Sequence, residues 1–410
     1  MRLHQKTLEN GLTLLCEPMP AVRSAAYTFL VPGGSIYDRR ATLGSAAVMA
    51  EWITRGAGSR GGPELLAAFD ELGVTHGEGA QAEHLALSGV TIGQLLLPAL
   101  ELVGDMLQRP RLEESEIDPI RALLIQSLRG IEDDPASKIA VELRRVHFPD
   151  PWGRPTQGTP ETLEAVVADR LREHFFQAVR PNGSILAVAG AVEWDRLVAQ
   201  VEAHFGGWKS RQPLALDLDA NRPQCRHITK ETQQIQISDA IRSVPVGHAD
   251  YYAARAAAAI LGGYSSSRLF TEVREKRGLC YSIHAGYDCV PQHAAIICQA
   301  GTAPDRAQET LDVMLAELGR LKRSGVVAEE LDTMRAGLKS SLVMQQESSS
   351  TRAAALAGDW YYLGRVRSVA EISAALDALT AERVSEYCAQ LPLDEMTLLT
   401  LGASELTRVA

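Results

Sequence analysis

The chain has 410 residues, of which 46% are hydrophobic and 22% charged, and its formal net charge is −10. A chain of this length is expected to form two or more domains, and the composition is typical of a globular protein rather than a disordered one. The acidic balance, without any long Lys/Arg block, argues against a nucleic-acid partner.

Six cysteines without a CxxC pair are too few for a disulfide scaffold, so we expect reduced thiols. The first residues contain no apolar segment of the secretory type. The most apolar run, residues 256–263, is much shorter than the ~20 residues that cross a bilayer. These features predict a cytoplasmic protein that does not interact with membranes.

The predicted elements mix strands and helices along the chain. Short apolar runs bounded by Gly, Pro or Asn predict strands, whereas apolar residues at helical spacing predict helices. The expected strands are 25–31, 85–92, 184–192 and 281–287, and the expected helices are 43–54, 119–131, 253–261 and 267–277. Gly56, Gly278 and the pair Asp134-Pro135 are expected to end helices. This mixture favours an α+β fold, with helices packed on one face of each antiparallel-rich sheet.

The sequence also contains an internal repeat. Residues 116–122 (EIDPIRA) resemble residues 330–336 (ELDTMRA), at an offset of 214. A second match pairs residues 99–102 with residues 310–313 at an offset of 211. A period this long indicates two duplicated domains rather than a solenoid. The Gly- and Pro-containing stretch 206–223 should hold the boundary, which gives an N-terminal domain at 1–212, a linker at 213–223 and a C-terminal domain at 224–410.

Four segments resemble the M16B family of peptidases, the pitrilysin and processing-peptidase-like group. They are TLENGLTLLCEPMP, RATLGSAAVMAEWITRGAGSR, PWGRPTQGTPETL and, most specifically, LGGYSSSRLFTEVREKRGLCYS at residues 261–282. The resemblance covers nearly the whole chain. It implies two homologous M16 domains that close as a clamshell, the first with the family's zinc helix and the second with its Arg/Tyr motif.

Catalytic members of that family carry His-x-x-Glu-His on one helix and a further glutamate ligand on a later helix. Here the resemblance places Ala47, Ala50 and Glu51 at the His, Glu and His positions of that motif. The Glu-Glu position of the later helix reads Gln126 and Ser127. A catalytic zinc needs three protein ligands and a water, which one carboxylate cannot supply. No two of the ten histidines are three or four residues apart, so we expect this chain to bind no metal and no other cofactor.

The Arg/Tyr motif, in contrast, is retained at Arg274 and Tyr281. The resemblance implies that these two side chains hold the substrate backbone and stabilise the oxyanion of the tetrahedral intermediate. A guanidinium and a phenol O–H are suitable donors to a carbonyl oxygen that gains negative charge. Taken alone, the two residues could equally be a charged last turn of a helix and an aromatic residue of a strand.

A substrate-binding strand is expected at Gly79, Ala80, Gln81 and Ala82. The resemblance places an edge strand there that pairs with bound peptide through backbone hydrogen bonds. The glycines of residues 77–79 could instead mark a turn before the strand 85–92.

Together these features predict the non-zinc, substrate-binding subunit of a heterodimeric M16B metallopeptidase that cleaves short or unfolded peptides. The chain would be inactive alone, with zinc in its partner subunit, and could form a homodimer in isolation. One alternative is an inert peptide-binding or scaffold subunit. A second alternative is a stand-alone peptidase with a metal site of another kind.

Overall fold

The structure, a computed structural model, describes residues 3–216, 218 and 226–407. The chain divides into two units, and each unit takes segments from both halves of the sequence. The first unit comprises residues 1–129, 150–220 and 343–366, and the second comprises residues 130–149, 221–342 and 367–410. The predicted linker, residues 213–223, lies largely outside the described residues.

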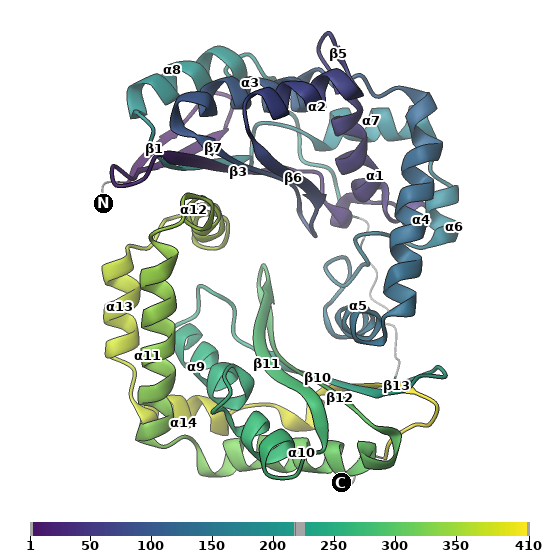
Figure 1. Ribbon diagram of the computed structural model, residues 1–410, viewed down its shortest axis with the longest axis vertical. Helices are drawn as coiled ribbons and strands as arrows, with labels where there is room; N and C mark the ends of the chain where they lie inside the picture. Colours follow the sequence, from purple (N-terminus) through teal and green to yellow (C-terminus); the bar gives the residue numbers. More distant parts are fainter. Residues whose placement is uncertain (1–2, 217, 219–225, 408–410) are drawn as a thin grey trace. The chain divides into compact units, whose positions relative to one another are not determined.

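A six-stranded sheet is the centre of the first unit (Figure 1). Its order is β1-β2-β8-β3-β7-β6, and only β2 and β8 run parallel. The strands are β1 His4–Thr7, β2 Thr13–Pro18, β3 Ser24–Pro32, β6 Thr75–Ala80, β7 His84–Ile92 and β8 Ile185–Gly190, with a separate hairpin of β4 Gly56–Ala57 and β5 Arg60–Gly61. The helices are α1 Ser45–Trp52, α2 Gly62–Glu71, α3 Leu96–Gln108, most of α4 Ile117–Asp133, α6 Pro160–Glu164, α7 Ala168–Ala178, α8 Trp194–Phe205 and α12 Ser349–Leu363.

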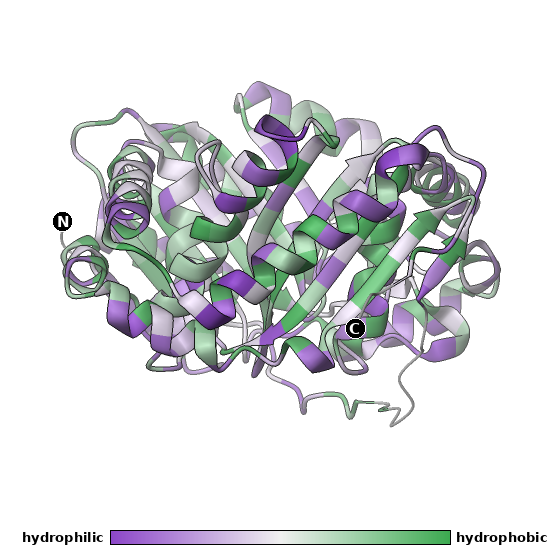
Figure 2. Ribbon diagram, turned by 90° about the horizontal axis from the view of Figure 1, so that it is seen from below, coloured by the Kyte–Doolittle hydropathy of each residue, from purple (hydrophilic) through white to green (hydrophobic). Residues whose placement is uncertain are grey.

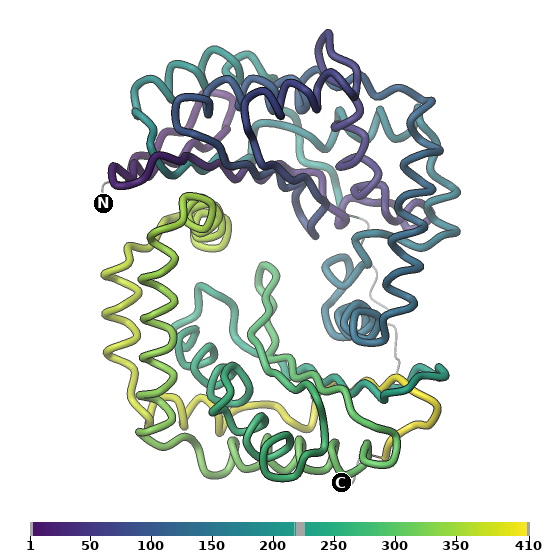
Figure 3. Tube along the Cα trace, viewed as in Figure 1, coloured from purple at the N-terminus to yellow at the C-terminus, as the bar shows by residue number. Residues whose placement is uncertain are grey.

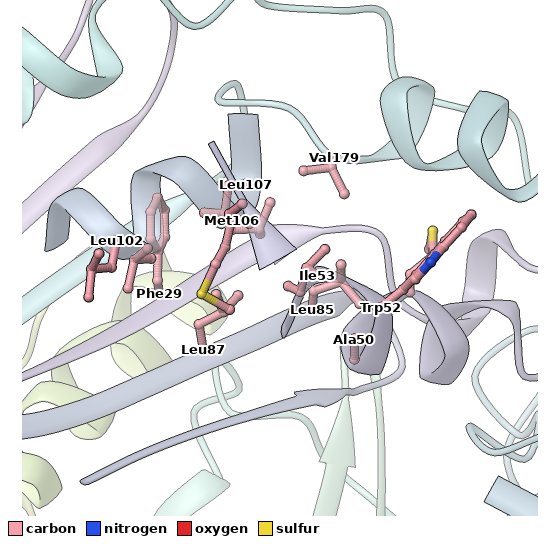
Figure 4. Packing of buried hydrophobic residues seen from close by; sticks show 14 of the residues in the cluster. Phe29, Ala50, Trp52, Ile53, Leu85, Leu87, Leu102, Met106, Leu107 and Val179 are labelled. Carbon is pink, nitrogen blue, oxygen red and sulfur yellow. The ribbon is translucent and has the colours of Figure 1, made fainter. Parts of the chain in front are cut away.

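Both faces of this sheet are covered. All six residues of β8 are buried, and they alternate between two clusters of apolar side chains. Leu186 and Val188 join the cluster that includes α1 and α3, whereas Ala187 and Ala189 join the cluster that includes α12. Figure 4 shows part of the first cluster, in which Phe29 and Leu87 of the sheet lie near Leu102, Met106 and Leu107 of α3. The expectation that helices cover only one face was wrong, because α12 covers the second.

The second unit has a five-stranded sheet in the order β11-β12-β10-β13-β9, in which only β13 and β9 run parallel. The strands are β9 His227–Thr229, β10 Ile235–Ser243, β11 Cys280–Val290, β12 His293–Thr302 and β13 Thr397–Gly402. The helices are α5 Pro135–His147, α9 Tyr251–Gly262, a π-helix Phe270–Glu275, α10 Ala307–Ser324, most of α11 Ala328–Gln345, α13 Val369–Asp377 and α14 Ala381–Ala389.

Equivalent strands follow the same order in the two sheets. The strands β6, β7, β3, β8 and β2 correspond in turn to β11, β12, β10, β13 and β9, and the parallel pair occupies the same place in both. Arg121 of α4 donates to the carbonyls of residues 163 and 166, and Arg335 of α11 donates to the carbonyls of residues 376 and 379. The predicted α+β fold is confirmed. The shared bonds of these two arginines support the predicted duplication.

The repeat also exchanges one helix in each direction. Helix α12, from the C-terminal half, packs on β3 and β8, whereas α5, from the N-terminal half, packs on β10 and β13. The trace in Figure 3 can be followed from α11 into α12 and back into α13. Arg352 of α12 donates to the buried carboxylate of Glu17 at 3.0 and 2.6 Å. Because α5 and α12 follow α4 and α11, they hold matching places in the repeat.

Most predicted elements are confirmed, with boundaries that move by one to three residues. The strands 25–31, 85–92, 184–192 and 281–287 are β3, β7, β8 and β11, and the helices 43–54, 119–131 and 253–261 are α1, α4 and α9. The segment 267–277 differs, because it winds as the π-helix, in which Lys276 N–H donates to the carbonyl of Thr271. Gly278 ends it with φ +59°.

The hydropathy pattern agrees with this architecture. Figure 2 shows strands that are largely hydrophobic between helices that carry both hydrophobic and hydrophilic residues. Across the described part of the chain, no helix is both long enough and apolar enough to cross a membrane. The described cysteines are free thiols at positions Cys16, Cys280, Cys289, Cys298 and Cys388.

Candidate functional site

Helix α1 carries the positions at which the family has two zinc ligands and a catalytic base. Ala47 and Ala50 are buried there, and Glu51 is partly exposed. Figure 4 shows Ala50 on the same helix as Trp52, with Ile53 directly after the helix. A methyl group has no lone pair to offer a metal, and the carboxylate of Glu51 is one ligand at most. The residues of α1 therefore do not fit a zinc ion.

The start of helix α1 is nevertheless held in place by hydrogen bonds. The buried carboxylate of Asp38 accepts hydrogen bonds from the N–H groups of Gly44 at 2.9 Å and Ala46 at 3.0 Å, which caps the helix start. Burial raises the pKa of Asp38 to about 8. Gly44 has φ 92°, and a Cβ there would lie 2.7 Å from the carbonyl oxygen of Gln157, so glycine is required at this turn.

The segment PWGRPTQGTPETL holds the start of α1 from outside. Arg154, which is buried, donates to the carbonyl of Asp38 at 2.8 Å and to both carboxylate oxygens of Asp150 at 2.8 Å. Thr162 Oγ1 donates to the carbonyl of Leu43 at 2.8 Å. The segment that carries part of the family resemblance thus supports the helix whose ligand positions have changed.

The position of the third zinc ligand is also changed. Gln126 and Ser127 are exposed on α4, and Ser127 Oγ lies 3.5 Å from the side-chain oxygen of Gln157. Within residues 3–216, 218 and 226–407, no three His, Cys, Asp or Glu side chains are grouped so that they could hold a metal ion. The ligand positions inferred from the family therefore supply at most one zinc ligand, Glu51, where a catalytic site needs three.

A histidine–glutamate pair beside α1 was not predicted. His76 and Glu78 lie on β6, and His76 Nδ1 is 3.0 Å from Glu78 Oε1. Burial raises the pKa of Glu78, while His76 lowers it and Glu51 raises it further. The i, i+2 spacing, which places two side chains on one face of a strand, was the available sequence signal. The carboxyl group of Glu78 is therefore a buried, titratable group beside helix α1.

The expected substrate-binding residues lie at the end of β6, which is an edge strand of its sheet. Gly79 and Ala80 close the strand. The carbonyls of Gln81 and Ala82 accept hydrogen bonds from the N–H groups of residues 35 and 36 at 3.0 and 2.9 Å. An added strand would therefore find its backbone partners along Thr75–Ala80 rather than at Gln81 and Ala82.

In the second unit, Arg274 differs in its ion pairing from the two other cations of its segment, Lys276 and Arg277. Lys276 Nζ and Arg277 Nη1 both pair with Glu272 at 2.7 Å. These hydrogen bonds lower the pKa of Glu272 to about 2, with Lys276 the largest contributor. Among the described carboxylates none pairs with Arg274. Glu272 therefore holds the two neighbouring cations in ion pairs and leaves the guanidinium of Arg274 available to a ligand.

Two aromatic rings position that guanidinium. The Cζ atom of Arg274 lies 4.7 Å from the ring centre of Phe270 and 5.4 Å from that of Tyr281. Phe270 and Arg274 are both in the π-helix, and Tyr281 is the second residue of β11. The Tyr281 side chain is 78% exposed, and its phenol has no hydrogen-bond partner among the residues that the structure describes. The predicted pair is thus brought together, with Phe270 as a third member that sequence reasoning missed.

Comparison with known families finds one sequence match. Residues 165–338 match the family described as the peptidase M16 inactive domain. Among curated proteins, an uncharacterized zinc protease of Bacillus subtilis, YmxG, is 25% identical over 401 residues, which cover 97% of this chain and 98% of the relative. An uncharacterized zinc protease of Mycobacterium bovis is 27% identical over 392 residues, which cover 94% and 90%.

Solved structures share the fold across the full length. A peptidase M16 inactive domain from Pseudomonas fluorescens superposes with a TM-score of 0.90 at 18% identity, covering 100% of this chain and 99% of the other. A protease from Helicobacter pylori gives a TM-score of 0.90 at 17% identity, covering 98% and 99%. A chain of complex III2 from Candida albicans gives 0.81 at 18% identity, covering 98% and 96%.

Proposed function

We propose that this M16 peptidase-family protein, which carries the M16 inactive domain across residues 165–338, is the subunit without zinc of a two-subunit peptidase. One contrast carries the proposal. The helix that should hold zinc is kept but has methyl groups at Ala47 and Ala50, whereas Arg274 and Tyr281 are paired and open to a ligand. The chain can therefore offer donors to a substrate although its own residues do not fit zinc.

In this proposal, Arg274 and Tyr281 donate hydrogen bonds to a scissile carbonyl bound between this chain and its partner. The guanidinium is permanently charged and the phenol is exposed, so both can reach an oxygen that becomes negative in the transition state. A donor of this kind is typically worth about 3 kcal/mol of transition-state stabilisation. The zinc and the catalytic base would belong to the partner subunit, since the residues of this chain do not fit them.

The substrate class is a short or unfolded peptide. Edge strand β6 can take such a peptide as an added strand, through backbone groups of Thr75–Ala80 that include Gly79 and Ala80. Pairing through the backbone makes few demands on side chains, which suits a strand that contains two glycines. The chain would be inactive alone and could form a homodimer in the absence of its partner.

A scaffold role is the second candidate. It is favoured by the likeness to a chain of complex III2, an assembly in which a protein of this fold is one component. In that case Arg274 and Tyr281 would be unused relics. A matched set of variants separates the two roles.

The test is to co-express the chain with an M16 subunit that carries His-x-x-Glu-His and to measure cleavage of unstructured peptides. Arg274→Ala and Tyr281→Phe are each expected to lower kcat/KM about 100-fold, while the complex still forms by size-exclusion chromatography. Arg277→Ala is the matched control, because Arg277 lies in the same segment but is occupied by Glu272. It is expected to leave turnover unchanged.

Three results would contradict the proposal. Full peptidase activity of the partner without this chain would remove any catalytic role. Unchanged kcat/KM in the Arg274→Ala complex would favour the scaffold role instead. Cleavage by this chain alone, with about one tightly bound zinc per molecule, would establish the stand-alone alternative.

A further inference from the structure

A cavity in the first unit is lined by residues just before and at the start of α1 and by residues of α7. Helices α1 and α7, both labelled in Figure 1, contact each other. Its volume is about 150 Å³. The polar side chains that line it are Arg39, Thr42, Ser45, Arg170, His174 and Gln177. Glu173 is the one acidic residue in the lining. The proposed peptidase function uses none of these residues.

The side chains that line this cavity carry a net positive charge, whereas the chain as a whole is negatively charged. Two guanidinium groups, of Arg39 and Arg170, face one carboxylate, and the chain as a whole has a net charge of −10. Arg170 pairs with Glu173 at 3.2 Å, which leaves the charge of Arg39 without a described acidic partner. The cavity is therefore locally cationic, which favours an anionic ligand.

One polar atom in the lining has no partner. His174 Nε2 is buried and makes no hydrogen bond within the part of the chain that the structure describes. Burial, followed by the nearby charge of Arg39, lowers the pKa of this histidine. A buried ring nitrogen normally finds a hydrogen-bond partner, and because residue 174 lines the hollow, a ligand that reaches its ring would supply one. An oxygen of a bound anion would satisfy it and offset the charge of Arg39.

The second copy of the repeat shows what fills the same place there. Helix α14 matches α7 at an offset of 213, so that Arg383 corresponds to Arg170 and Tyr387 to His174. Each arginine pairs at 3.2 Å with the glutamate three residues later. In the second unit, however, Arg383 also pairs with Asp250, and the phenol of Tyr387 bonds to Ser243 Oγ at 2.8 Å.

Among the described residues of the first unit, no second carboxylate pairs with Arg170, because the carboxylate at the start of α1, that of Asp38, bonds to the backbone of that helix. Asp250 directly precedes α9, whereas the residue that directly precedes the equivalent helix α1 is Gly44, which has no side chain. The first copy thus has the same arginine, lacks the acid, and has a histidine with a free buried nitrogen where the second copy has a bonded tyrosine. An oxyanion would occupy the part of the site that Asp250 occupies in the second unit.

We propose that this cavity binds a small oxyanion, a phosphate or a carboxylate, held by Arg39, Arg170 and His174. Thr42 and Gln177 line the same space and supply further donors. The volume admits a group of a few heavy atoms and excludes a folded partner. Arg39 and Arg170 are both exposed, so an anion would reach them from solvent, and saturable binding separates this site from general attraction to a basic surface.

The test is titration of the purified chain with inorganic phosphate, succinate or acetate at constant ionic strength, followed by isothermal calorimetry and by the thermal unfolding midpoint. Saturable binding that raises Tm is expected for phosphate, a carboxylate or both, and the stronger of the two identifies the source. Arg39→Gln and Arg170→Gln should each weaken binding about tenfold, the loss of one charge-assisted contact. His174→Phe, which removes the nitrogen and fills space, should also weaken it.

The matched control is Arg383→Gln in the second unit, which breaks the equivalent pair with Asp250. Its affinity for the anion is expected to equal that of the parent chain. Binding that Arg39→Gln, Arg170→Gln and His174→Phe leave unchanged would overturn the proposal, as would the absence of saturable binding by all three anions. Because the readout is binding to this chain alone, its failure would not affect the peptidase proposal.

Discussion

The two exchanged helices, α12 on the first sheet and α5 on the second, hold matching places in the repeat but differ in the burial of their ion pairs. Helix α12 packs its residues Ala353, Leu356 and Ala357 on an apolar face, and its Arg352 forms a buried ion pair with Glu17. Helix α5 also buries apolar residues, Ile139, Leu143 and Val146, and adds polar contacts, among them His147 with Thr397 at 2.9 Å. The ion pair of Arg144 with Asp288 is about one-third exposed on both sides.

This difference indicates how the two attachments should respond to change. Apolar burial does not depend on pH or salt, but the buried charges within it must remain paired. Partly exposed polar contacts are individually weak and can be replaced by water. The attachment of α12 should therefore depend strongly on one ion pair, whereas the attachment of α5 should be spread over several weaker contacts.

The largest effect is expected from Arg352→Ala. It leaves the carboxylate of Glu17 buried and unpaired, which should cost about 3–5 kcal/mol of stability. Chemical denaturation measures the loss, and hydrogen exchange should place it at α12 and the strands that it covers. The double variant Glu17→Met with Arg352→Met is the control, because two apolar side chains should restore most of the stability. A loss below about 1 kcal/mol for Arg352→Ala would mean that apolar packing alone attaches this helix.

A smaller loss of stability is expected on acidification. His84 of β7 is buried, its ring lies 4.7 Å from that of Tyr361 on α12, and burial together with Arg180 lowers its pKa to about 4. The folded state therefore binds the proton less tightly than the unfolded state, so stability is full above about pH 6.5 and falls as the pH drops towards 4. The shift corresponds to about 3 kcal/mol.

The measurement is thermal or chemical unfolding at pH 7 and pH 4.5, with hydrogen exchange to locate the change. His84→Phe keeps an aromatic ring in the same place and should reduce the loss between the two pH values. Exchange should increase at α12 before it increases at α5. An identical pH profile for the parent and His84→Phe would exclude this histidine as the cause.

The smallest effect is expected from Arg144→Ala at the attachment of α5. The pair with Asp288 is partly exposed on both sides, so its loss should cost less than about 1 kcal/mol, and less still at high salt. Denaturation at low and high ionic strength is the measurement. A cost equal to that of Arg352→Ala would show that the two attachments are alike after all.

The sequence by itself determined the class of fold, and it predicted the repeat and, through the family resemblance, the changed zinc positions. Strands such as 25–31 and helices such as 119–131 follow from local periodicity, since the spacing of apolar residues records which face of an element is buried. Given the family resemblance, alanine at position 47 in place of a ligand and at position 50 in place of the base needs no structure to be recognised, because a methyl group neither binds a metal nor accepts a proton.

Only the tertiary structure decided which groups meet. Periodicity shows that a face is buried but not which element buries it, so the exchange of α5 and α12 left no mark in the pattern. Arg274, Lys276 and Arg277 are chemically similar in sequence, and the position of Glu272 alone decides which cation stays available. The unpartnered nitrogen of His174 depends in the same way on a missing neighbour, which becomes visible only when the two copies of the fold are compared.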